Sequence, residues 1–146
     1  MNKKAESFKA MLDELKIAAF TPEELKDDFH TVAFRSNMEI QKQLLPMLVL
    51  LDDSIYAMMR VFVAPKVVTE DRKAEMAAYL NEFNKQFKIF KYYISDEGDI
   101  VLDCCIASSD EHFDANLVRA VLDVVIQHLN DKYTEIMQHV WGGNKE

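Results

Sequence analysis

The spacing of hydrophobic residues changes from helical to alternating in the middle of this chain. Met76, Leu80, Phe83 and Phe87 are four, three and four residues apart, which predicts one apolar stripe on a helix that begins near Thr69. From residue 89 onward, apolar side chains occupy alternate positions, as in a strand with one buried face. The change of period predicts a helix packed directly on a β-hairpin, with Phe83 and Phe87 buried between them.

The predicted hairpin turns at residues 95–98, where Gly98 can adopt a positive φ without steric cost. The returning strand alternates again over residues 100–106. Asn81 and Asn84, at the end of the preceding helix, are expected to bond to the backbone at the corner between helix and strand.

Three further strands are predicted before the helix. In residues 28–40 the apolar side chains occupy mainly every second position, so they lie on one face of a strand. In residues 55–64 two sets of side chains alternate regularly between the two faces. Residues 44–51 are apolar at both odd and even positions, so both faces of that strand are apolar. The strand is therefore covered on both faces or lies against a partner. Pro46 lacks a backbone N–H and is expected at an edge-facing or bulged position. The short connections predict an antiparallel meander.

A narrow apolar stripe predicts a first helix over residues 4–18. The next residues, Thr-Pro-Glu-Glu at positions 21–24, have the pattern of a helix start and predict a single helical turn.

The longest predicted element is the last helix, which starts after Ser108 or Ser109 and ends at Gly142. In its first half the apolar residues cover an arc about 160° wide, against the ~100° that a surface helix needs. One flank therefore carries more apolar surface than the core of one chain requires. This flank consists of Leu117, Val121 and Val124.

Together these elements predict an α+β fold in the order α-β-β-β-α-β-β-α, with an antiparallel sheet of about five strands covered by helices. The length of 146 residues predicts one domain over residues 1–146. With 49% hydrophobic residues and only three Gly and three Pro, the composition excludes a disordered chain.

The charge balance narrows the possible partners. Lys and Arg number 17 against 25 Asp and Glu, giving a net charge of −8, which disfavours nucleic acid and anionic membranes. No apolar run approaches the ~20 residues of a membrane span, and no secretory signal pattern is present. Cys104 and Cys105 are strand neighbours that point to opposite faces, so we expect free, reduced thiols and a cytoplasmic location.

The candidate chemical sites are weak. Glu135 and His139 lie four apart on one helix face, but no third metal ligand has a fitting spacing. The acidic residues Asp96, Glu97 and Asp99 lack the spacing of a calcium loop. We therefore expect no metal, no cofactor and no catalytic residues.

One segment supports a resemblance to a known family. The helix end LNEFN at residues 80–84, followed by a strand, the turn DEGDI at residues 96–100 and another strand, resembles the YbjN-like family of bacterial proteins, often labelled sensory transduction regulators. The similarity runs from the first helix to the last. It implies a fold similar to that of type III secretion chaperones, which are dimers.

The leading functional hypothesis is a non-enzymatic protein-binding module, chaperone-like or a regulatory adaptor, that acts as a homodimer with an unknown protein partner. Its interface is expected on the helix flank or on strand 44–51, where the candidates are Leu45, Met47 and Val49. The alternative is a small-molecule sensor or enzyme with a site between helix and sheet. A deep pocket with converging polar groups would favour the alternative, and a flat apolar patch would favour protein binding.

Overall fold

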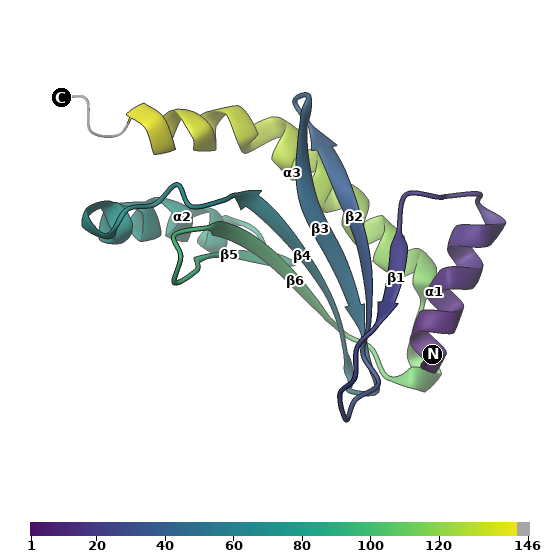
Figure 1. Ribbon diagram of the computed structural model, residues 1–146. Helices are drawn as coiled ribbons and strands as arrows, with labels where there is room; N and C mark the ends of the chain where they lie inside the picture. Colours follow the sequence, from purple (N-terminus) through teal and green to yellow (C-terminus); the bar gives the residue numbers. More distant parts are fainter. Residues whose placement is uncertain (143–146) are drawn as a thin grey trace.

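The computed structural model describes residues 1–142 of the chain. The elements are α1 (Lys3–Glu14), β1 (Thr21–Glu24), β2 (Val32–Ile40), β3 (Gln43–Leu51), β4 (Tyr56–Ala64), η1 (Glu70–Arg72), α2 (Lys73–Gln86), β5 (Phe90–Ile94), β6 (Ile100–Ala107), η2 (Asp110–His112) and α3 (Ala115–Gly142). Six strands form one antiparallel sheet in the order β1-β2-β3-β4-β6-β5 (Figure 1). The predicted α+β class is confirmed, with six strands instead of about five. The likeness to secretion chaperones stays a prediction.

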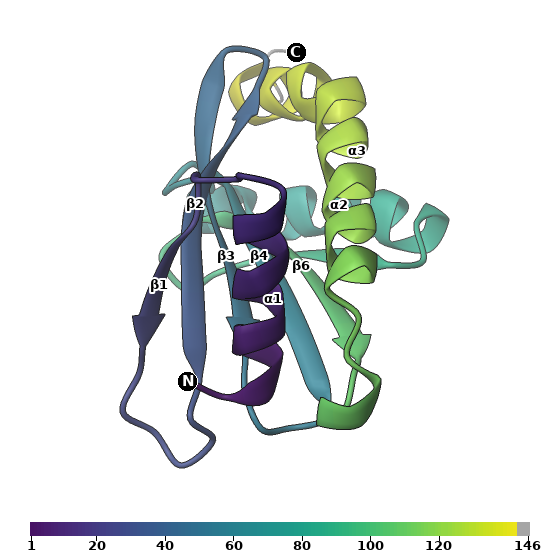
Figure 2. The same cartoon turned by 90° about the vertical axis from the view of Figure 1, so that its right-hand side faces the viewer.

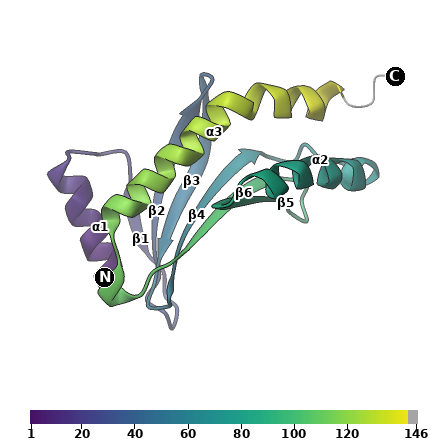
Figure 3. The same cartoon turned by 180° about the vertical axis from the view of Figure 1, so that it is seen from behind.

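The three α-helices lie on the same side of the sheet. Figure 2 shows α1 and α3 side by side on that side, and Figure 3 shows α3 crossing the sheet while α2 covers β5 and β6. The hydrophobic core fills the space between helices and sheet; for example, Phe8 of α1 packs edge-on against Phe34 of β2 at 4.9 Å between ring centroids. No helix of residues 1–142 covers the opposite side, which we call the open face.

The β2–β3 hairpin decides which residues of β3 face the core. Its turn is Gln41 and Lys42, both with positive φ, which is the two-residue turn that matches the twist of the strands. This turn pairs Leu45 with Met38 and Val49 with Phe34. The predicted interface residues of strand 44–51 are core residues: Leu45, Met47 and Val49 are exposed by 5%, 6% and 0%, so they are not available at the surface of the single chain.

Pro46 occupies the edge-facing position that was predicted. The two-residue turn makes Ile40 and Gln43 a hydrogen-bonded pair, so Asn37 and Pro46, three steps along the ladder, are a non-bonded pair. The nitrogen of Pro46 therefore points away from β2. On that side the pairing with β4 begins only at Met47, so no ladder bond is lost.

The helix-to-hairpin unit is confirmed in outline. Gly98 has a φ of +88° in the β5–β6 turn, and Phe83 is buried at 5% exposure. Asn84 donates to the carbonyl of Tyr92 and accepts from its N–H, at 3.2 and 2.8 Å. Phe87 is only half-buried, contrary to prediction, because it is the C-cap residue of α2 and its extended backbone turns the ring out of the helical stripe.

Residues 21–24 form strand β1 and not the predicted helical turn. They pair with β2 from Thr21 opposite Arg35 to Glu24 opposite Val32. The guanidinium of Arg35 lies 2.8 Å from the carboxylate of Glu23. The ladder with β2 supplies the backbone hydrogen bonds that one isolated helical turn leaves unsatisfied, so it overrides the local capping pattern.

Two helix boundaries also differ from prediction. Helix α1 ends at Glu14 rather than at residue 18, because Lys16 adopts a positive φ and the N–H of Ile17 donates back to Leu12 at 2.8 Å. Helix α3 begins at Ala115, after the short helix η2 that follows Ser109. Its cap is Asp114, whose carboxylate accepts from the N–H groups of the second and third helical residues at 2.9 and 3.3 Å.

Candidate functional site

The open face carries two apolar rows that run across the strands. The strand register places outward-facing side chains of neighbouring strands side by side. The first apolar row crosses β4, β6 and β5 and consists of Phe62, Val101 and Tyr93, with Val101 buried at 1% exposure between its neighbours. The second apolar row crosses β3, β4 and β6 and consists of Leu50, Met58 and Cys105.

An ion pair separates the two rows. Arg60 of β4 lies directly opposite Asp103 of β6, and its Nε and Nη2 donate to the two carboxylate oxygens at 2.8 and 3.0 Å. These hydrogen bonds raise the pKa of Arg60 above its ordinary value. Because the two charges neutralise each other in a bidentate geometry, the centre of the open face is polar but carries no net charge.

Several large side chains of the open face are strongly exposed. Leu44 is exposed by 65%, Tyr56 by 51% and Tyr93 by 41%. Large exposed apolar side chains on one face of a sheet mark that face as a candidate interface.

The open face is also electrically balanced. The charged residues at outward-facing strand positions are three cations, Arg35, Arg60 and Lys91, and three anions, Glu23, Glu39 and Asp103. The ammonium of Lys91 reaches the sheet edge, where it donates to the carbonyls of Asn84 and Phe87. The whole chain has a net charge of −8, so its excess negative charge lies elsewhere. A neutral, largely apolar face on an acidic chain can approach another acidic protein with little repulsion.

The predicted helix flank is only partly on the surface. Leu117 and Val124 are exposed by 48% and 51%, while Val121 is buried at 8% exposure. Val121 turns into the core because it lies next to Val118 and Leu122 on the face of α3 that packs on the sheet. Val121, predicted as an interface residue, is therefore not available at the surface of the single chain.

A pocket lies where the flank of α3 approaches the end of α2 and the start of β5. We call it the His128 pocket; it has a volume of about 390 Å³, walls from Phe87, Phe90, Val124 and His128, and a rim from Asp123, Gln127, Asp131 and Lys132. The Nε2 of His128 is 2.7 Å from the hydroxyl of Tyr92. Burial lowers the pKa of His128 to about 4, so its imidazole is neutral at pH 7. This pocket is a site between helix and sheet, where the alternative hypothesis expects one.

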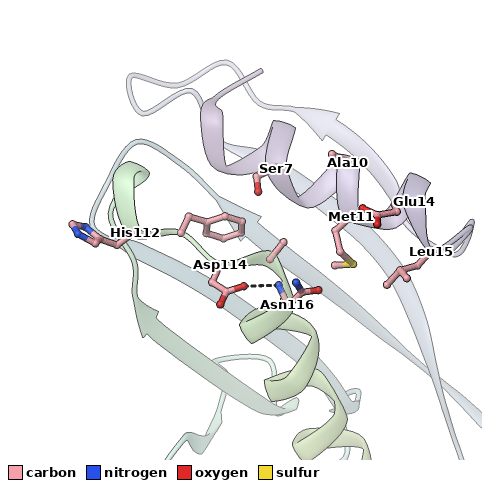
Figure 4. Close-up of a pocket in the computed structure, with 10 residues that line it drawn as sticks. Ser7, Ala10, Met11, Glu14, Leu15, His112, Asp114 and Asn116 are labelled. Atoms are coloured by element: carbon pink, nitrogen blue, oxygen red, sulfur yellow. Dashed lines mark hydrogen bonds between the residues drawn. The ribbon is translucent and has the colours of Figure 1, made fainter.

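A second cleft, of about 580 Å³, lies between α1 and the start of α3 (Figure 4). Its polar side chains serve local structure: Asp114 caps α3, and His112 pairs with Ser109 at 3.0 Å. In Figure 4 the ring of His112 points away from the side chains of α1, so the histidine and Glu14 do not converge on a common point. This cleft therefore lacks the geometry of an acid–base pair.

The other residues singled out in the sequence have structural contacts. Glu135 accepts a hydrogen bond from the hydroxyl of Tyr79 at 3.0 Å, and His139 stacks on the Tyr79 ring at 3.9 Å, so both hold α3 against α2. Asp99 accepts from the N–H of Lys66 and the hydroxyl of Ser95 in the β5–β6 turn. Within residues 1–142 no three His, Cys, Asp or Glu side chains are grouped to hold a metal ion.

Burial and hydrogen bonding shift the pKa of both thiols and of three carboxyl groups. Cys104 is fully buried, which raises the pKa of its thiol to about 12, and burial also raises the pKa of Cys105. Hydrogen bonds lower the pKa of Asp27, Asp71 and Glu75, mainly through Thr31, Thr69 and Arg72. These shifts stabilise the charged carboxylates, whereas a general acid needs a raised pKa.

Comparison with known proteins adds a family to this description. Among residues 1–142, no helix is both long and apolar enough to span a bilayer. A comparison with curated proteins finds no match. The model of the family YbjN, described as a putative bacterial sensory transduction regulator, matches residues 5–137. This match covers most of the sequence, and the chain therefore belongs to the YbjN family.

Proposed function

We propose that this chain is a non-enzymatic regulatory adaptor of the cytoplasm, which binds protein through the open face and works as a homodimer. One observation carries the proposal: two apolar rows flank a neutral ion pair on a sheet face that no helix of residues 1–142 covers. The family description as a sensory transduction regulator supports a regulatory role.

The composition of the open face supports contact with protein. Tyrosine, phenylalanine, methionine and arginine are enriched in protein interfaces, and Tyr93, Phe62, Met58 and Arg60 lie together here. A two-fold dimer buries the same surface on both copies, which suits a face without net charge because each copy meets a neutral surface. The depressed carboxylate pKa values and the protonated thiols support the non-enzymatic part of the proposal.

Sedimentation equilibrium at tens of micromolar tests the homodimer. We expect the dimer mass for the wild type and the monomer mass for Met58→Glu, because the new charge is placed twice in one apolar interface. The control is Leu15→Glu, which adds the same charge at a residue that is exposed by 44% and lies just after α1 on the helical side. Circular dichroism of each variant checks that the fold is intact.

Two results would contradict this assignment. If the wild type has the monomer mass, the homodimer proposal is wrong. If Leu117→Glu splits the dimer but Met58→Glu does not, the interface lies on the helix flank and not on the open face. A different protein partner is tested by affinity capture with mass spectrometry, in which the proteins captured by the wild type are compared with those captured by two variants. A partner bound through the open face stays with wild type and Leu15→Glu and is lost with Leu44→Glu.

A further inference from the structure

The His128 pocket combines aromatic walls with a single polar atom. Phe87 and Phe90 lie 4.6 and 4.4 Å from the His128 ring, measured between ring centroids, and Val124 adds an aliphatic wall. Apolar walls around one well-placed polar group are the usual construction of a small-molecule site. The volume of about 390 Å³ also lies within the range of such sites.

The hydrogen bond to Tyr92 determines which nitrogen of His128 carries the proton. Burial raises the pKa of Tyr92, so its hydroxyl keeps its proton and is a donor. If the Tyr92 hydroxyl donates to Nε2 of His128, both buried atoms have a hydrogen-bond partner. If Nε2–H donated to the hydroxyl oxygen instead, the hydroxyl proton would have no acceptor among residues 1–142. The neutral imidazole then carries its own proton on Nδ1.

Nδ1 of His128 is available to a ligand. It makes no hydrogen bond within residues 1–142. Among these residues, the only fully buried side-chain polar atom that lacks a hydrogen-bond partner is Nε2 of His139, so Nδ1 of His128 does not belong to that class. Nδ1 therefore keeps some accessible surface, and His128 is one of the residues that line the pocket. The pocket thus presents one N–H donor between apolar walls.

The rim selects against negative charge. Asp123 and Asp131 place two carboxylates there, and the single cation, Lys132, lies 3.7 Å from Glu135 and is partly neutralised by it. An anionic ligand, such as a fatty acid, meets net repulsion at the entrance. The flat walls favour ring systems, which stack on aromatic side chains.

We propose that the His128 pocket binds a small, flat, uncharged aromatic compound that accepts a hydrogen bond from Nδ1 of His128. The site lies on the helical side of the sheet, so it is separate from the open face and does not depend on the proposed function. If both hold, one face receives a chemical signal and the other contacts protein.

Two bicyclic probes test the donor directly. Quinoline offers an acceptor nitrogen, whereas indole, of similar size, offers only an N–H donor, and both are uncharged at pH 7.5. In NMR titrations that follow the imidazole resonances of His128, we expect saturable shifts with quinoline at a Kd of about 1 mM or tighter. Indole should bind roughly three- to tenfold more weakly, because it leaves Nδ1–H without an acceptor. The free protein should show the proton on Nδ1.

Two variants locate the binding. Val124→Trp fills the pocket from an exposed position and should abolish the quinoline shifts. The matched control, Leu117→Trp, adds the same side chain two turns earlier on the same flank of α3, outside the pocket, and should leave binding unchanged. The proposal is overturned if His128 does not respond to quinoline, if indole binds as well or better, if the proton is on Nε2, or if Val124→Trp still binds.

Discussion

Lowering the pH from 7 to 5 should destabilise the protein through His128. Its side chain is 5% exposed, and burial lowers its pKa to about 4, while the unfolded chain has the ordinary value of about 6.5. Lys132 also lowers this pKa and Asp131 opposes the shift. The unfolded state then binds a proton at a pH where the folded state does not, so the free energy of unfolding falls as the pH drops through 6.5, and the loss is complete below about 4.

This difference of about 2.5 between the two pKa values lowers the free energy of unfolding by about 3 kcal/mol once the pH is below about 4. At pH 5 the free energy of unfolding is lowered by about 2 kcal/mol. Urea unfolding at the two pH values measures it, and with a slope of about 2 kcal/mol per M the midpoint should move by about 1 M from this residue alone. The comparison variant is His128→Phe, which keeps a ring in place but does not titrate. It loses the Tyr92 hydrogen bond at both pH values, so that cost cancels in the difference.

The wild type should therefore lose about 2 kcal/mol more than His128→Phe between pH 7 and pH 5. All other groups are the same in the two proteins, so their contributions cancel in the comparison. Equal losses in the two proteins, or an imidazole of His128 that titrates near pH 6.5 in the folded chain, would refute the reasoning.

Two further predictions concern the helix-to-hairpin unit. Phe83→Ala should lower the free energy of unfolding by about 3–5 kcal/mol in urea titrations, because the buried ring contacts Tyr79, Tyr92 and His128. Phe87→Ala should lower it clearly less, because Phe87 is only half-buried. Equal losses in the two variants would contradict this difference in burial. Gly98→Ala should cost more than about 2 kcal/mol, since Gly98 has a positive φ and a Cβ there would collide with the carbonyl oxygen of Val68; an unchanged unfolding midpoint would rule this out.

Local patterns predicted the elements whose periodicity is strong. The spacing of Met76, Leu80 and Phe83 and the alternation around Gly98 gave the helix, the hairpin and its turn correctly. The pattern at residues 21–24 failed, because four residues carry a capping signal equally well in a helix start or in an edge strand. The partner strand β2 decides between the two, and it begins eight residues later.

The candidate site depended on information that a single strand does not contain. Strand β3 is apolar on both parities, so its sequence alone did not tell the core residue Leu45 from its exposed neighbour Leu44. The hairpin register with β2 makes that choice. In the same way, Arg60 and Asp103 are 43 positions apart, and Tyr92 and His128 are 36 apart. The sheet brings the first pair together, and the packing of α3 on β5 brings the second pair together.

Both edges of the sheet are closed to further strands. On one side, β1 is four residues long, includes Pro22 without an N–H and carries two carboxylates. On the other, the side chain of Asn84 bonds both backbone groups of Tyr92, as the next strand would. Unpaired edges are where sheets of separate molecules join into fibrils. Because both edges disfavour a further strand, a contact between copies of this sheet would use a face, and a two-fold contact of that kind would stop at a closed pair instead of growing into a fibre.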